Sequence, residues 1–187
     1  IDRYVYQSLR KIPVKIFEYH NNPEYSLEAV LDVLFGMIGL EGPEPWGTME
    51  KASYIYRAYL RELNRKYGTS VFSWNELLAT RLAEQFDKTL PTLKKTMGIY
   101  RVYDQMKQND YKVQPENYSL LELAITKATV KETIFEYDAD FLEMSPSGME
   151  KFSSLCLEPN SPVTNPGAFN AFAYVVKYGS EFQIDQI

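Results

Sequence analysis

The 187-residue chain has very little cysteine and histidine, since Cys156 and His20 are the only residues of these two types. A single cysteine excludes an internal disulfide framework, and one Cys with one His excludes a Cys/His zinc cluster. His20 is the only histidine that a Ser-His-Asp site could use, and a place in a loop or at a helix end is the simpler interpretation of it. We therefore expect no metal, no other cofactor and no enzymatic activity in this segment; the alternative is an enzyme whose catalytic domain lies outside it.

Long apolar runs and glycine-rich phosphate loops are also missing. The longest apolar run, around residues 30–40, is interrupted by Asp32 and is too short and too polar to span a membrane. Neither the P-loop nor the dinucleotide-binding glycine motif occurs. No signal peptide is visible. Because the chain begins at Ile1 rather than Met, we interpret it as a fragment or a processed product whose address signal has been lost.

The net charge is −5 and the pI is near 5.1, which argues against a uniformly basic nucleic-acid binder and leaves room for a local basic groove. The acidic run 132–143 lacks the ligand spacing of a calcium loop, so we interpret it as a solvent-facing strip. Hydrophobic residues make up 45% of the chain, enough for a packed core. The length fits one domain or one part of a repeat array.

Apolar residues recur with helical spacing, for example from Leu27 to Ile38 and from Ala52 to Leu63. Prolines and the capping-box pairs Ser73–Glu76 and Ser147–Glu150 mark helix starts. No long alternating run is found, so we expect an all-α fold. The predicted helices cover 23–38, 49–66, 73–87, 91–109, 116–128, 130–144, 148–157 and 166–178, with linkers at 41–47 and 157–166.

Two recurrences suggest internal repeats. The segment 55–59, Ile-Tyr-Arg-Ala-Tyr, returns at 99–103 as Ile-Tyr-Arg-Val-Tyr. An aromatic residue followed by Ser or Asn opens alternate helices, at Tyr25-Ser26, Trp74-Asn75, Tyr118-Ser119 and Phe169-Asn170. Helix pairs of this kind bury their apolar stripes by stacking on the next pair. We therefore expect an α-solenoid of stacked antiparallel helix pairs.

The sequence resembles the pentatricopeptide repeat (PPR) family. Residues 96–115 are similar to the second helix and exit loop of that motif, and 71–78 and 166–179 to its first helix. The units are longer than the family's usual repeat, so we expect a divergent member. The resemblance implies these divisions: a flank or preceding repeat at 1–21, repeats at 22–70 and 71–114, a repeat with an insertion at 115–165, and a further first helix at 166–187.

The same resemblance implies that each repeat binds one nucleotide of single-stranded RNA. In this family the polar residue after the opening aromatic and the last residue of the unit read the base edge, which short amide and hydroxyl side chains are suited to do. The alternative is that these residues are helix caps or first-turn polar residues. The implied pairs are Ser26 with Ser70, Asn75 with Gln114, and Ser119 with Asn165, with Asn170 opening an incomplete fourth.

Cations for the RNA backbone are available on the predicted helix 49–66. Arg57 and Arg61 lie four residues apart, with Arg65 one turn further, so all three share one face. They are candidates to contact phosphates. The alternative is a solvated helix face with scattered ion pairs.

The resemblance implies an organellar gene-expression factor in the mitochondrial matrix, acting in transcript stability, processing or translation. Its partner would be a single-stranded organellar transcript or a ribonucleoprotein assembly, with no DNA and no membrane span. The alternative function is a protein-interaction scaffold of the same fold, such as a structural subunit of a mitochondrial ribosome.

Overall fold

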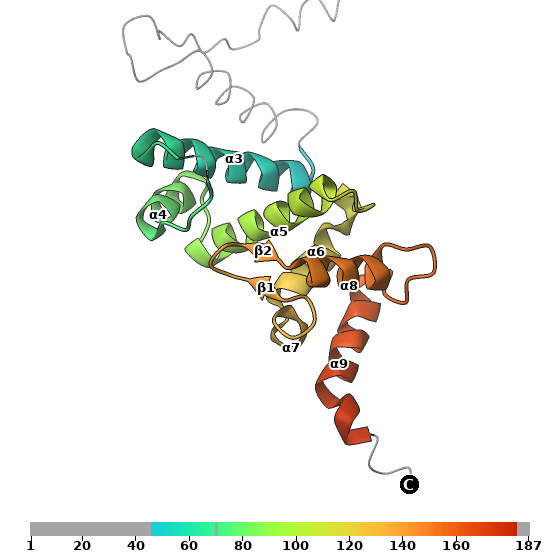
Figure 1. Cartoon of the computed structure of the whole chain (residues 1–187). Helices are drawn as coiled ribbons and strands as arrows, with labels where there is room; N and C mark the ends of the chain where they lie inside the picture. The colour runs from blue at the N-terminus through green and yellow to red at the C-terminus, as the bar shows by residue number, and fades with distance from the viewer. Residues whose placement is uncertain (1–45, 70, 183–187) are drawn as a thin grey trace, which may run out of the picture. The chain divides into compact units, whose positions relative to one another are not determined.

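The structure is a computed structural model that describes residues 46–69 and 71–182, and this part is predominantly helical (Figure 1). The all-α class is therefore confirmed, while the predicted helix 23–38 lies outside the described residues. The helices are α3 (Thr48–Tyr67), α4 (Glu76–Gln85), α5 (Leu90–Gln108), the 3-10 helix η1 (Pro115–Asn117), α6 (Tyr118–Thr126), α7 (Ala128–Lys131), α8 (Pro146–Cys156) and α9 (Pro166–Phe182). The strands are β1 (Tyr137–Asp138) and β2 (Glu143–Met144).

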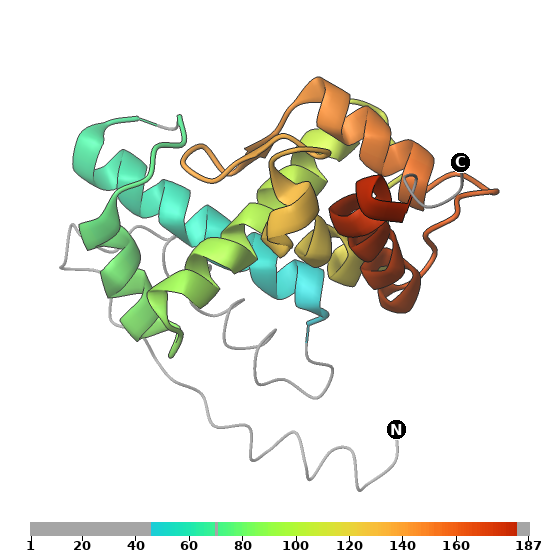
Figure 2. The same ribbon diagram turned by 90° about the horizontal axis from the view of Figure 1, so that it is seen from below.

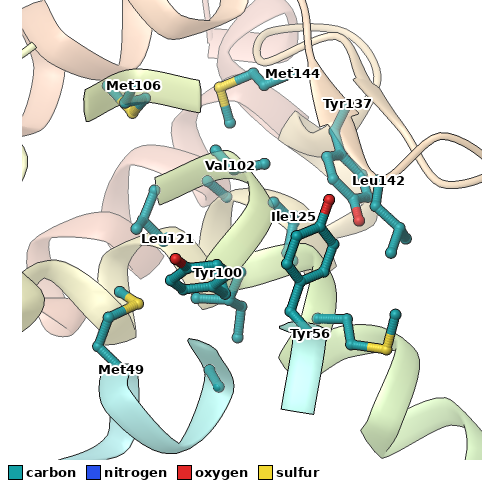
Figure 3. Packing of buried hydrophobic residues seen from close by; sticks show 14 of the residues in the cluster. Met49, Tyr56, Tyr100, Val102, Met106, Leu121, Ile125, Tyr137, Leu142 and Met144 are labelled. Carbon is teal, nitrogen blue, oxygen red and sulfur yellow. The ribbon is translucent and has the colours of Figure 1, made fainter. Parts of the chain in front are cut away.

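Helix α5 is the centre of the described fold, because it packs against α3, α4, α6 and β2 (Figures 1 and 2). Helix α9 packs on α6 and α7. The two helices that carry the recurring sequence, α3 and α5, contact each other through Tyr56 and Tyr100, whose ring centroids are 5.5 Å apart. Both tyrosines belong to one buried cluster that also receives side chains from α6 and the hairpin (Figure 3).

The predicted helix 130–144 is wrong. Helix α7 ends at Lys131, and the chain then forms a short antiparallel hairpin in which Tyr137 pairs with Met144. An unbroken helix would place Glu136 and Asp140 one turn apart, where like charges repel. In the hairpin these two carboxylates are exposed, while Tyr137 and Met144 are buried.

Two predicted capping boxes are also wrong, because each helix is capped by a different residue. Helix α4 begins at Glu76 with Asn75 as its N-cap, since the Tyr59 hydroxyl donates to the Ser73 carbonyl and accepts from the Asn75 N–H, both at 2.7 Å. Helix α8 begins at Pro146 with Ser145 as its cap. The last helix continues through Gly179 to Phe182 rather than ending at 178.

Two glycines allow close approaches around the hairpin. A Cβ on Gly148 of α8 would lie 1.9 Å from the backbone oxygen of Phe135, and a Cβ on Gly98 of α5 would lie 2.3 Å from the Tyr137 hydroxyl oxygen. At Gly148 the obstructing atoms are backbone, and at Gly98 the nearest is the end of the buried Tyr137 side chain, so a side chain at either position requires a neighbour to shift. Helix α8 also ends near the core at Cys156, a buried thiol whose pKa is raised to about 12 by burial.

The Glu136 carboxylate ties the hairpin to α8. It accepts hydrogen bonds from Lys151 Nζ at 2.8 Å, from the Ser145 hydroxyl at 2.6 Å and from the Ser147 hydroxyl at 3.2 Å. These bonds, led by the one from Lys151, lower the pKa of Glu136 from 4.5 to about 2. Glu136 itself has a φ of 48°, so its backbone turns the chain sharply before β1.

We expect this carboxylate to make the fold sensitive to acid. Because the folded pKa lies below the unfolded one, its contribution is fully present above about pH 4.5 and is lost as the pH falls towards 2. Urea unfolding between pH 6 and 2 checks this, with Glu136→Gln as the comparison. The stability gap between the two proteins should close over that window, and a gap that does not change with pH would contradict the assignment.

Candidate nucleic-acid interface

Charge is distributed unevenly along the described chain. Residues 46–112, which form α3 to α5, contain 12 Lys and Arg against 7 Asp and Glu. Residues 113–182 contain 4 Lys and Arg against 10 Asp and Glu. Residues 46–112 are therefore net basic although the whole chain is net acidic. A polyanion would be attracted to α3–α5.

Within the basic part, a groove of about 550 Å³ runs between α3 and α4. Its walls carry three cations and one carboxylate. Helix α3 supplies Glu62, Arg65 and Lys66, and helix α4 supplies Arg81 with Leu78, Leu82 and Gln85. Arg65 Nη2 lies 2.7 Å from Glu62 Oε2 in an exposed ion pair. The groove therefore keeps a net positive charge along both walls.

An aromatic side chain follows the cations of α3. Tyr67 is 49% exposed, and the Lys66 Nζ lies 5.1 Å from the centre of its ring. The Tyr67 hydroxyl accepts a hydrogen bond of 2.9 Å from Asn75 Nδ2, which fixes the orientation of the ring. Cations next to an exposed aromatic ring are the combination that binds single-stranded nucleic acid without sequence preference.

Asn75, a predicted base-reading residue, is a helix cap in the structure. Its Oδ1 accepts from the Leu78 N–H at 3.0 Å while its Nδ2 donates to Tyr67. An amide side chain has two N–H donors and two acceptor lone pairs. Asn75 therefore uses one donor and one acceptor within the chain, and Leu78 and Tyr67 set its orientation.

Of the other predicted base-reading residues, Gln114 and Asn165 lie just before helices, while Ser119 and Asn170 lie near the starts of α6 and α9. Asn165 caps α9 by accepting from the Ala168 N–H at 3.0 Å, and Gln114 is exposed where η1 begins. Asn170 is exposed in α9, and Ser119 lines a depression between the starts of α3 and α6 together with Glu50 and Glu116. Those two carboxylates disfavour phosphate near Ser119. Ser26 and Ser70 lie outside the described residues.

Arg57 and Arg61 are exposed on α3, but neither lines the groove. Arg101, the counterpart of Arg57 in the recurring segment, has a different role. Its guanidinium donates to the Tyr56 hydroxyl at 2.7 Å, pairs with Glu143 and lies 4.5 Å from the centre of the Phe72 ring. Arg101 therefore joins α5 to α3 and β2, and is not available to RNA.

Sequence reasoning missed Lys66 and Arg81 as members of one site. They come from different helices, and no spacing rule connects them before α3 and α4 pack together.

In the described ranges 46–69 and 71–182, no group of three or more His, Cys, Asp or Glu side chains is arranged to hold a metal ion. In this same part of the chain, every helix is too short or too polar to cross a bilayer. No protein-family model, no curated protein and no solved structure matches the chain.

Proposed function

We propose that the chain is a single-stranded RNA-binding module of helical repeats, and that the groove between α3 and α4 takes the sugar-phosphate backbone. The observation that carries this proposal is the meeting of Arg65, Lys66 and Arg81 along one groove in the basic part of the chain. Phosphate neutralisation by Lys and Arg supplies most of the affinity of non-specific RNA binding. The exposed ring of Tyr67 beside Lys66 offers a surface on which a base can stack.

The proposal includes an α-solenoid of stacked helix pairs. Its support is that α3 and α5, which carry the recurring segment, pack against each other through equivalent tyrosines. The unit boundaries at 114/115 and 165/166 coincide with the starts of η1 and α9. As the PPR resemblance implies, we place this module in a mitochondrial gene-expression factor.

In this proposal the affinity for RNA comes mainly from phosphate contacts and only weakly from base-specific contacts. Asn75 and Asn165 already serve as helix caps, and Ser119 has two carboxylates beside it. A chain that binds through Arg65, Lys66 and Arg81 would show broad RNA affinity with weak sequence preference. Asn75 is the predicted reader nearest to the groove in the sequence, and its second N–H and second lone pair would suit a single base contact.

A protein-interaction scaffold is the second candidate function. It is favoured by the acidic half of the chain and by exposed apolar side chains on α9, where Tyr174 and Val175 are 57% and 62% exposed. Large apolar side chains in an exposed patch are typical of protein-binding surfaces. In this case the charged side chains of the groove between α3 and α4 would face solvent and would not bind RNA.

We expect the double variant K66Q/R81Q to weaken RNA binding in a salt-dependent manner. For single strands, the slope of log K against log salt is about −0.7 per neutralised phosphate, so losing two contacts should reduce its magnitude by about 1.4. Fluorescence anisotropy with labelled oligoribonucleotides between about 20 and 200 mM salt measures this slope.

Lys127→Gln is the matched control, because Lys127 is exposed and lies in the acidic half of the chain. Circular dichroism of both variants checks that the helices remain folded. Equal slopes for the control and the double variant would exclude the groove as the RNA site. A chain that binds no RNA pool even at the lowest salt would favour the scaffold.

A further inference from the structure

A second, smaller cavity of about 210 Å³ lies away from the α3–α4 groove, where the start of α5 meets α6, α7 and the hairpin. Its apolar lining includes Ile125, Tyr137 and Leu142, which Figure 3 shows coming from α6 and the two sides of the hairpin. Three lysines, Lys94, Lys95 and Lys131, complete the wall. No carboxylate lines this cavity.

Each of the three ammonium groups lies near a carboxylate, but the distances differ. Lys95 Nζ lies 2.6 Å from Glu122 Oε1, a tight pair. Lys94 Nζ is 3.8 Å from the carboxylate of Asp140 and 4.7 Å from the centre of the Trp74 ring. Lys131 Nζ is 3.6 Å from Glu132. The side chains of Asp140 and Glu132 are largely exposed, so their pairs with Lys94 and Lys131 contribute little and are easily exchanged.

We propose that this cavity binds the phosphoryl group of a phosphomonoester. A phosphoryl group at pH 7 carries a charge of about −1.5 to −2 and three acceptor oxygens. Lysines from α5 and α7 approach the cavity from different elements, so each can donate to a different oxygen. A carboxylate has only two oxygens and a single negative charge, so it matches a cluster of lysines less well than a phosphoryl group does.

The apolar lining indicates what the phosphate is attached to. A cavity of about 210 Å³ is larger than a phosphoryl group requires, and Ile125, Tyr137 and Leu142 provide an apolar surface for the carbon skeleton that bears it. The 5′ end of an RNA strand and a small phosphorylated metabolite share this chemistry. The cavity is separate from the α3–α4 groove in its residues, so this proposal does not depend on RNA binding there.

Titration calorimetry on the full chain tests the proposal, with inorganic phosphate and glycerol phosphate at constant ionic strength and chloride as the reference anion. The variant K94Q/K131Q should bind both at least tenfold more weakly. Lys112→Gln, an exposed lysine outside the cavity, should bind as the unchanged protein does. Ala139→Phe fills the cavity without altering charge and should also reduce binding at least tenfold.

The source of the phosphate is decided by comparing an oligoribonucleotide with a 5′-phosphate and the same strand with a 5′-hydroxyl. Tighter binding of the phosphorylated strand that Ala139→Phe removes supports an RNA end. Binding of glycerol phosphate without such a difference supports a small phosphomonoester. Thermal melts confirm that each variant is folded. Absence of phosphate binding at millimolar concentration, or an equal loss with Lys112→Gln, overturns the proposal.

Discussion

Gly148→Ala is expected to lower the free energy of unfolding by about 3 kcal/mol, the upper end of the usual cost of overpacking and a large effect for one methyl group. The added Cβ would lie 1.9 Å from the oxygen and 2.6 Å from the carbon of the Phe135 carbonyl. Both are backbone atoms, so the clash is relieved only if α8 moves away from the segment before β1. Urea unfolding monitored by circular dichroism measures the loss.

Gly179→Ala is the matched control for this substitution. Gly179 lies in α9, where an added Cβ meets its nearest neighbour at an ordinary 3.6 Å. Alanine is a better helix former than glycine, so this variant should gain up to about 1 kcal/mol. A loss below about 1 kcal/mol for Gly148→Ala would show that α8 does not cross the chain at Phe135 as described.

Tyr59→Ala is expected to cost about 3–5 kcal/mol, as large-to-small changes at buried aromatic residues do. Tyr59 is fully buried, and its ring packs against Phe72 at 5.5 Å and Trp74 at 6.0 Å between centroids. Its hydroxyl also bonds the backbone at Ser73 and Asn75. The change removes the contact that sets where α4 begins, and thermal and urea unfolding both report it.

Tyr59→Phe separates the ring from the hydroxyl. It keeps the packing and leaves the Asn75 N–H and the Ser73 carbonyl without their partner, which costs about 1–3 kcal/mol for part-buried groups. Hydrogen exchange at the Asn75 amide should become faster in this variant. If Tyr59→Phe is as destabilising as Tyr59→Ala, the hydroxyl rather than the ring dominates at this position.

The long helices of this fold could be predicted from sequence, and the reason is visible in α3 and α5. Their apolar stripes extend over several turns, and the predicted ranges 49–66 and 91–109 differ from the observed helices by one residue at each end. Over a helix of this length, the repeating apolar stripe outweighs the secondary-structure preferences of single residues. The two helices pack against each other, and burial of the apolar stripes in this contact accounts for the periodic pattern in the sequence.

The hairpin could not be predicted in this way. Each strand has only two residues, and Glu136 and Leu142 adopt positive φ values that residue preferences do not suggest. What holds the hairpin is tertiary, namely the Arg101–Glu143 pair with α5 and the bonds of Glu136 to α8. The alternation of buried Phe135 and Tyr137 with exposed Glu136 was the available signal, and it was too short to count against a helix.

Only those residues of the candidate site that lie together on one helix could be predicted from the sequence. The spacing of Arg57, Arg61 and Arg65 indicated a basic face, and Arg65 does line the groove. Its neighbour across the groove, Arg81, comes from α4 and is brought there by packing. The base-reading role of the predicted polar residues stays a prediction, because the structure shows what Asn75 and Asn165 bind within the chain and nothing that they bind outside it.

Because Cys156 is buried at the end of α8, the reactivity of its thiol reports local opening of the structure there. It is the only cysteine in the chain, and its burial at the end of α8 keeps the thiol protonated at neutral pH. Alkylating reagents attack the thiolate, so they modify this sulfur when the structure around the end of α8 opens. The rate of modification then reports how often this end of α8 opens, without any added label.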